Sequence, residues 1–229
     1  MWQFKECVRG ISEACRAFGT PVTGGNVSFY NESPRGAIDP TPVIGMIGVI
    51  EGRQPITASF KDEGDVIILL GETREELGGS EYLAVLHGRK TGMPPRVDLK
   101  RERALQRLML DACSRGWPKS AHDCSEGGLA VALAECCIME ETRLIGATVS
   151  PQTTDHSPRS RVDALLFGES AGRIVVSCEP QRVDAMLALA KRHSIPASAI
   201  GEVGGTRLII TPWIDAPVAD LSASWRTAL

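Results

Sequence analysis

The amino-acid sequence predicts an α+β fold in which helices and strands are mixed along the chain. Apolar residues recur at steps of three and four in several stretches, which is typical of amphipathic helices. Short continuous apolar runs between these stretches predict buried strands. Two runs near the end of the chain flank a pair of glycines like the arms of a hairpin. This mixture favours α+β over a purely parallel, doubly wound sheet.

Composition excludes several classes of protein. The chain has 229 residues and a formal net charge of −3, so no basic excess is available to hold a nucleic-acid backbone or an anionic membrane. No apolar run approaches the roughly 20 residues that span a bilayer. Charged residues interrupt the first residues at once, unlike a signal peptide. The seven cysteines form no C-x-x-C pair, so we expect a reduced, cytoplasmic chain without nucleic-acid or membrane partners.

Residues 3–18 are predicted to form the first helix. Its apolar stripe consists of Phe4, Val8, Ile11, Cys15 and Phe18. The glycine that follows suits a C-terminal cap, and a proline two residues later prevents the helix from resuming. No capping residue precedes the stripe, so we expect the chain to begin inside a helix of a longer protein.

A polar segment divides the chain into two predicted domains. Residues 43–50 form an apolar run that predicts a fully buried strand, and residues 51–63 are polar and turn-like. Residues 1–52 are too few to bury a core alone, so we expect an incomplete first domain. Residues 60–229 are expected to form a complete second domain.

The second domain is predicted from alternating apolar patterns. We expect strands at residues 66–70, 144–149 and 173–178, helices at 80–89 and around 105–112, 129–136 and 183–190, a polar loop at 152–160, and a closing hairpin of residues 199–203 and 207–211. In the helix at 80–89, Leu83 and Leu86 are expected to point inward.

The first candidate functional segment is the glycine-rich stretch at residues 24–28. Two consecutive glycines allow a phosphate to approach the backbone, whose amides can donate to it. Asn26 offers a neutral oxygen to a hard cation such as Mg²⁺, and Ser28 offers a hydroxyl to a substrate. A tight turn between strands is the more common role of an isolated glycine pair.

The second candidate segment, residues 77–82, places two glycines before Ser80. This serine is a good N-cap for the helix that follows, and a helix start preceded by glycines can also bind an anion. For this segment alone, simple capping is the preferred interpretation.

The third candidate segment, residues 121–129, contains His122, Asp123, Cys124 and Ser125 in succession. Asp123 could ligate Mg²⁺, and Ser125 could cap a helix that begins near residue 127. A hydrolase triad is rejected, because neighbours on an extended chain point to opposite faces. Cys124 is interpreted as a small buried thiol rather than a nucleophile.

The fourth candidate segment, residues 167–173, places Glu169 and Ser170 before a predicted strand. A loop there could present both side chains to a ligand. The alternative is a solvated turn closed by an ion pair.

In their order and spacing these segments resemble one family, phosphoribosylformylglycinamidine synthase, in the second half of its synthetase subunit. The resemblance covers essentially the whole chain. Its most specific part is the run Gly-Gly-Asn-Val-Ser-Phe-Tyr-Asn-Glu at residues 24–32. The later motifs Leu-Gly-Gly-Ser-Glu-Tyr, His-Asp-Cys-Ser-Glu-Gly-Gly-Leu and Phe-Gly-Glu-Ser are shared more loosely with relatives such as aminoimidazole ribonucleotide synthetase.

The resemblance implies an ATP-dependent ligase of purine biosynthesis that converts formylglycinamide ribonucleotide to the amidine with ammonia. It implies that Gly25 contacts ATP, Asn26 binds Mg²⁺ and Ser28 contacts the substrate. The catalytic residues are expected in an N-terminal half that this chain lacks. Further implied partners are a separate glutaminase subunit and a small accessory subunit.

The resemblance also implies the identity of the two domains. Residues 1–52 correspond to the last part of a second aminoimidazole-ribonucleotide-synthetase-like N-domain, and residues 60–229 to the complete second C-domain. Asp123, Glu169 and Ser170 then mark a pseudo-symmetric second site that holds a structural nucleotide or nothing. Ala171 stands where the family's active copy has glutamine, and therefore lacks an amide that could contact substrate.

Three interpretations remain open at this point. The chain is a C-terminal fragment of the synthetase that is inactive alone, or a non-catalytic module that binds nucleotide or packs against a separate first half. The truncated helix and the unpartnered apolar run at residues 43–50 motivate the second interpretation. A kinase-like synthetase of the same superfamily is a third, and the run at residues 24–32 argues against it.

Overall fold

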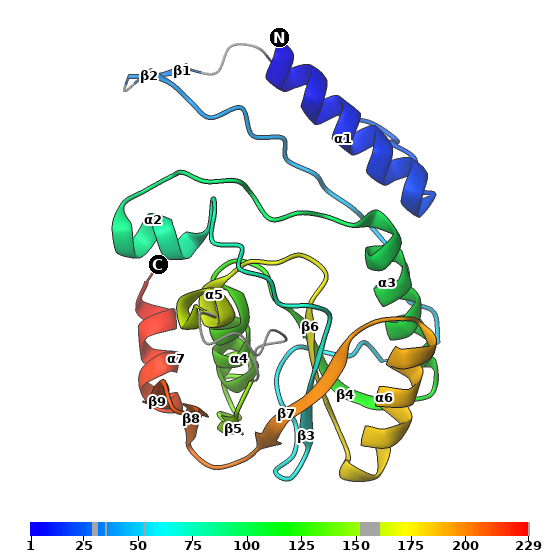
Figure 1. Ribbon diagram of the computed structural model, residues 1–229, viewed down its shortest axis with the longest axis vertical. Helices are drawn as coiled ribbons and strands as arrows, with labels where there is room; N and C mark the ends of the chain where they lie inside the picture. Colours follow the sequence, from blue (N-terminus) through cyan, green and yellow to red (C-terminus); the bar gives the residue numbers. More distant parts are fainter. Residues whose placement is uncertain (29–31, 35, 53, 152–160, 229) are drawn as a thin grey trace. The chain divides into compact units, whose positions relative to one another are not determined.

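The chain divides between Gln54 and Pro55 into two units. The computed structural model describes residues 1–28, 32–34, 36–52, 54–151 and 161–228 (Figure 1). Each unit is considered by itself. In the described part of the chain, no helix is both long enough and apolar enough to cross a membrane.

One long amphipathic helix accounts for much of the first unit. Helix α1 spans Trp2–Phe18 and ends at Gly19, whose left-handed φ of 70° lets its N–H donate to the Cys15 carbonyl at 2.9 Å. The predicted helix and its glycine cap are therefore confirmed. None of its residues is buried, and Phe4 and Val8 are 40% and 46% exposed. Within the described part of the first unit, the apolar stripe thus has no core to cover.

The rest of the first unit contains little regular structure. Strands β1 (Glu32–Ser33) and β2 (Gly36–Ala37) pair antiparallel. The expected buried strand at residues 43–50 is wrong, because this run forms no strand and Ile47 is 96% exposed. A buried strand needs neighbours for its amides and cover for its faces, and the described part of this unit offers the run neither.

The second unit is built on a mixed sheet covered by helices, in agreement with the predicted α+β class. Seven strands are described, in the order β4-β6-β3-β7-β5-β8-β9. All neighbouring pairs are antiparallel except β5 and β8. The strands are β3 (Val66–Leu70), β4 (Pro118–Asp123), β5 (Ala147–Val149), β6 (Ile174–Cys178), β7 (Ala197–Val203), β8 (Arg207–Ile210) and β9 (Ile214–Pro217).

Helices cover both faces of this sheet at β3, so this central strand is apolar throughout. On β3, Ile67 and Leu69 join one buried cluster, while Ile68 and Leu70 join another on the opposite face. Helices α4 (Gly128–Ile138), α5 (Val162–Phe167) and α7 (Val218–Thr227) contribute to the first cluster, and α3 (Leu99–Ser114) and α6 (Val183–Arg192) to the second. Figure 1 shows α3 and α6 side by side.

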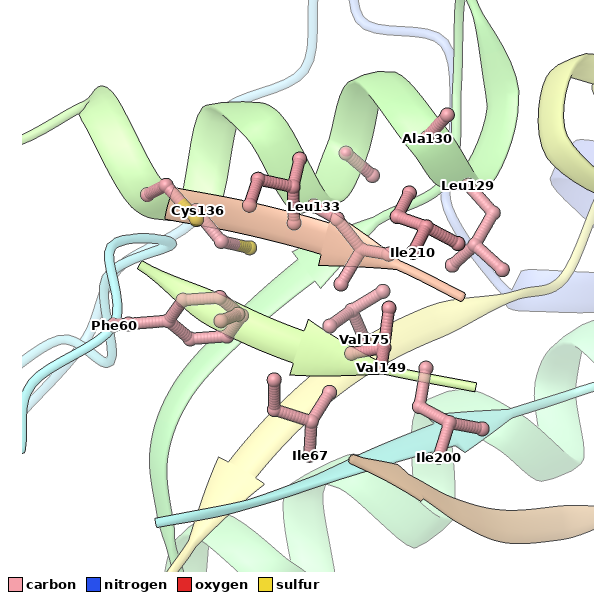
Figure 2. Close-up of a cluster of buried hydrophobic side chains, with 14 of the residues drawn as sticks. Phe60, Ile67, Leu129, Ala130, Leu133, Cys136, Val149, Val175, Ile200 and Ile210 are labelled. Atoms are coloured by element: carbon pink, nitrogen blue, oxygen red, sulfur yellow. The ribbon is translucent and has the colours of Figure 1, made fainter. Parts of the chain in front are cut away.

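Helix α4 supplies the centre of the first cluster. Figure 2 shows Leu129, Leu133 and Cys136 pointing from the helix toward the strands, where Val149 and Val175 meet them. Leu129 and Leu133 are completely buried. The helical periods predicted around residues 105–112, 129–136 and 183–190 are confirmed by α3, α4 and α6.

The predicted closing hairpin is wrong. Strand β5 lies between β7 and β8, so that Ala147 pairs with both Val203 and Leu208. The turn between the two arms bends around this third strand, and Gly146 exchanges backbone hydrogen bonds with Gly204 and Gly205 at 2.8 and 2.7 Å. Local sequence indicates two strands joined by a glycine turn, but it cannot reveal a strand inserted between them.

The prediction for the helix at 80–89 is partly wrong. Helix α2 spans Glu81–His87, with Leu83 half-buried, but Leu86 is 65% exposed. Periodicity did not indicate several short elements. These are strands β4 and β9, helices α5 and α7, and the short 3₁₀ helix at Pro180–Arg182. The predicted loop at 152–160 lies outside the described residues.

Candidate functional site

The first predicted site lies in the first unit, between α1 and β1. Gly25, Asn26 and Ser28 are all exposed, and the rest of the motif, residues 29–31, lies outside the described part. A Cβ atom placed on Gly24 or Gly25 would meet nothing within 4 Å. Neither glycine has a positive φ. Within the described chain nothing therefore requires glycine at these two positions. A ligand or another chain that approaches the backbone closely is the remaining reason for glycine here.

This segment fits a metal ion only as a partial ligand set. Asn26 supplies one amide oxygen, whereas Mg²⁺ takes six oxygen ligands in octahedral geometry. Among the residues that the structure describes, no three or more His, Cys, Asp or Glu side chains gather where they could hold a metal. Further ligands would come from nucleotide phosphates, water or another chain.

The other predicted residues gather at one end of the sheet in the second unit. Strands β4 and β6 pair so that Asp123 stands opposite Ile174. Just beyond this pair, the Cys124 N–H donates to the Arg173 carbonyl at 3.0 Å. The pairing brings the segment after β4 alongside the segment before β6, although the two are far apart in sequence.

Glu169 connects three segments at this end of the sheet. Its Oε1 accepts hydrogen bonds from the backbone N–H of Glu81 at 2.8 Å and of Gly127 at 2.9 Å. The first amide opens α2, and the second immediately precedes α4. The Glu169 N–H in turn donates to the Glu76 carbonyl at 3.2 Å. The prediction that a loop presents Glu169 is thus refined, because the carboxylate is bound by the chain's own amides.

Ser170 and Arg173 lie beneath this loop, each only 1% exposed. The Ser170 hydroxyl accepts from the Arg74 N–H at 3.1 Å and lies 3.3 Å from the Arg74 carbonyl. Arg173 donates to the Ser170 carbonyl at 3.1 Å and to the Thr73 hydroxyl at 3.2 Å. Burial lowers the pKa of Arg173 below its ordinary value. The alternative of a solvated turn closed by an ion pair is therefore wrong.

Asp123 has a different environment from Glu169. Its side chain is 71% exposed and accepts a hydrogen bond from the Ser125 hydroxyl. Ser125 therefore does not cap α4 through its side chain, and Gly127 holds the N-cap position. His122 lies 3.2 Å from Glu135 through Nε2 and 2.8 Å from the Asp123 carbonyl through Nδ1. Since Ser125 bonds to Asp123 instead of His122, the rejection of a triad is confirmed.

Two buried cysteines, one before α4 and one near its C-terminal end, are inert. Cys124 is 6% exposed, and burial raises its pKa to about 11. Burial likewise raises the pKa of Cys137 to about 12. A thiol with such a pKa carries almost no thiolate at neutral pH, so the buried-thiol interpretation of Cys124 is confirmed.

The glycine-rich segment before α2 is a helix cap. The Ser80 hydroxyl accepts from the Leu83 N–H at 3.4 Å and donates to the Leu77 carbonyl at 2.6 Å. Ser80 is 2% exposed, so it is not available to a ligand. The ring of Tyr82 stacks on Phe167 with centroids 5.3 Å apart. The capping interpretation of this segment is confirmed.

Residues 74–78 also line a groove of about 1160 Å³. Leu83, residues 92–94 and 96–100, and Arg161 complete its lining, which mixes four basic with three acidic side chains. Arg161 pairs with Asp163, and the Arg96 N–H donates to Glu76 at 2.9 Å. Sequence reasoning missed this groove and the role of Arg74, because neither the segments nor their spacing form a motif.

Comparison with known proteins identifies both units. The family described as AIR synthase related protein, C-terminal domain, matches residues 62–211, and the corresponding N-terminal domain family matches residues 1–50. The first match covers well over half of the chain.

Similar sequences carry one protein name. Phosphoribosylformylglycinamidine synthase subunit PurL of Anaeromyxobacter dehalogenans is 47% identical, over 100% of this chain and 31% of its own length. The Moorella thermoacetica protein of the same name is 49% identical, over 91% of this chain and 28% of its own length. The chain thus spans less than a third of the length of these relatives, and the resemblance inferred from the motifs is confirmed.

Solved structures share the fold. PurL of Thermotoga maritima complexed with FGAR superimposes with a TM-score of 0.63 at 21% identity, over 73% of this chain and 29% of that one. The same protein complexed with ATP gives a TM-score of 0.56 over 73% of this chain. At this level of identity the similarity concerns the fold alone.

Proposed function

Because the chain belongs to the AIR synthase related family, we propose that it is part of an ATP-dependent ligase that converts formylglycinamide ribonucleotide to formylglycinamidine ribonucleotide. The observation that carries this proposal is the 47% identity to a PurL subunit along the whole chain. The ligands bound in two of the structural relatives, FGAR and ATP, agree with the same reaction. The enzyme is a carbon–nitrogen ligase of purine biosynthesis that acts in the cytoplasm on a small-molecule substrate.

Three residues of the first unit contribute to a composite site. Bound ATP supplies the phosphoryl group that activates the amide oxygen of the substrate, and Mg²⁺ balances the phosphate charge. The Gly25 amide donates to the nucleotide phosphates, the Asn26 side-chain oxygen supplies one ligand to Mg²⁺, and the Ser28 hydroxyl binds the substrate. The exposure of all three residues and the open space at Gly25 support these roles.

The composite site needs parts that lie outside this chain. Residues 1–52 represent the end of a second N-domain, and residues 60–229 the second C-domain. The catalytic groups belong to the N-terminal two thirds of the parent length. Ammonia comes from a separate glutaminase subunit, and a small accessory subunit completes the assembly. A solved Thermotoga maritima complex named PurLQS agrees with such a multi-subunit enzyme.

Asp123, Glu169 and Ser170 are assigned to a pseudo-symmetric second site in the C-domain. Asp123 is an exposed polar group at this end of the sheet, whereas Ser170 is buried. Ser170 therefore supports the loop instead of meeting a ligand. The second site has a structural role, and turnover does not occur there.

Reconstitution tests the proposed reaction. The chain is supplied with ATP, Mg²⁺, ammonia and formylglycinamide ribonucleotide, with and without the N-terminal two thirds of the Anaeromyxobacter dehalogenans relative. We expect turnover only in the mixture, and we expect Asn26→Ala to lower it by about 100-fold or more. Ser12→Ala, an exposed serine whose hydroxyl bonds only within α1 at 2.7 Å, is the matched control. Turnover by the chain alone, or full activity of Asn26→Ala, contradicts the proposal.

A second candidate function is a non-catalytic packing module. The exposed run at residues 43–50 and the uncovered stripe of α1 favour it, since large apolar surfaces seek a partner. The partner is the remainder of the N-domain, because residues 1–50 match the N-terminal domain family and are too few to bury a core alone. Sedimentation of the mixture separates the candidates: a complex without turnover supports the module, and no complex excludes it.

A further inference from the structure

The Glu169 carboxylate is bound as an anion by the protein's own backbone. One oxygen accepts from two amide N–H groups, at 2.8 Å from Glu81 and 2.9 Å from Gly127. Both amides stand where helices begin, and such groups have no acceptor within their helices. Hydrogen bonds from amides to an ionised carboxylate are stronger than neutral ones.

Backbone hydrogen bonds of Glu169 and its neighbours fix the position of the carboxylate. The Glu169 N–H is held by the Glu76 carbonyl, and the next residue, Ser170, exchanges hydrogen bonds with the backbone of Arg74. Buried Arg173 donates to the Ser170 carbonyl at 3.1 Å. Residues 168–173 therefore form a rigid platform, and Glu169 is the side chain that this platform directs at the two helix starts.

The backbones around this carboxylate are in direct contact. A Cβ atom on Gly128 would lie 2.5 Å from the Gly168 carbonyl, and one on Gly71 would lie 2.1 Å from the Gly172 carbonyl. Gly128 also has a φ of +69°, which a side chain would strain. No larger residue fits at either position, so the three segments close on one another with the carboxylate between them.

We propose that Glu169 is an internal anion that holds this corner of the domain closed. The corner is defined by residues 76–81, 124–128 and 168–173. Glu169 is thus a positioning residue that ties α2, α4 and the loop before β6 together. This inference stands on the geometry of the second unit and is independent of the proposed reaction.

Chemical rescue tests the proposal on the full chain. Glu169→Ala should lower the Tm of the second unit by about 5 °C, because two charge-assisted hydrogen bonds are lost. Sodium acetate at about 0.2 M should restore part of this loss, since a free carboxylate can fill the vacated position and stabilise the fold by mass action. Sodium chloride at the same ionic strength should not. Glu126→Ala, an exposed glutamate in the same segment, is the matched control and should show neither effect.

Amide NMR shifts give a second measurement that does not depend on the alanine variant being folded. In Glu169→Gln, which keeps an acceptor but loses the charge, the amide protons of Glu81 and Gly127 should both move upfield. In Glu179→Gln, an exposed glutamate outside this corner, both should stay in place. A wild-type Tm for Glu169→Ala, equal action of acetate and chloride on it, or unchanged shifts in Glu169→Gln would each overturn the proposal.

Discussion

Two apolar runs of this chain have opposite fates. Residues 66–70 form β3, where Ile68 is completely buried, while residues 43–50, which also lack polar side chains, leave Ile47 96% exposed. β3 pairs with β6 and β7 and has a buried cluster on each face. The run at 43–50 has neither strand partner nor cover in the described part of its unit. The difference shows that an apolar run becomes a strand only when neighbours satisfy its amides and bury its faces.

Hydrogen exchange should reveal the largest difference between the two runs. We expect the amides of β3 to be protected about 10⁴-fold or more in the full chain, because they open only with the unit. The amides of residues 43–50 should exchange at the rate of an unstructured peptide. Mass spectrometry of peptides after timed exchange measures both. Comparable protection in the two runs would break the comparison. Protection gained on adding the N-terminal two thirds of the Anaeromyxobacter dehalogenans relative would sharpen it.

Truncation of apolar side chains should have the next largest effect, and only in the second unit. Leu108→Ala removes a completely buried side chain of α3, and we expect it to lower the free energy of unfolding by about 2–5 kcal/mol. Ile47→Ala should change the same quantity by less than about 0.5 kcal/mol, since its side chain already contacts solvent. Urea unfolding monitored by circular dichroism measures both. Leu110→Ala, 71% exposed on the same helix, controls for helix propensity. A large effect at Ile47 would show that its run packs against something in solution.

Loss of a buried ion pair should have an intermediate effect. Lys119 lies 2.9 Å from both Asp62 and Asp65, and these carboxylates raise its pKa. Lys119→Met leaves Asp65, 2% exposed, without its cation. We expect a cost of about 2–3 kcal/mol in the free energy of unfolding, because a buried charge without a partner is costly. Adding Asp65→Asn should recover part of this cost in a double-mutant cycle, and no recovery would contradict the pairing.

Acid should produce the smallest effect. The Arg101 guanidinium, assisted by Arg74, lowers the pKa of Glu72. A lowered folded-state pKa means that the carboxylate stabilises the fold above its unfolded pKa and loses this contribution as the pH falls through the folded value. Since Glu72 is 37% exposed, we expect less than about 1 kcal/mol. Urea unfolding of Glu72→Gln should therefore differ from wild type at pH 7 and converge with it in acid. A constant difference at every pH would contradict this account.

Part of the fold was predictable because it depends on near neighbours. The stripe and glycine cap of α1, the buried run of β3 and the Ser80 cap of α2 depend on residues within a few positions of one another. The candidate segments were found for the same reason, since glycine pairs and polar residues beside them are visible in the sequence. Their roles were harder to predict, as the buried positions of Ser170 and Arg173 show.

The sequence by itself determined the α+β class, the main helical periods and the family resemblance, which the comparisons confirmed. The tertiary structure decided the rest. In it, β5 lies between β7 and β8, and residues 43–50 remain exposed. Glu169 accepts a hydrogen bond from the amide of Glu81, 88 residues away. Helical periodicity and capping arise from contacts along the chain, so sequence records them directly. Strand partners, burial and the acceptor of a given amide depend on segments that only folding brings together.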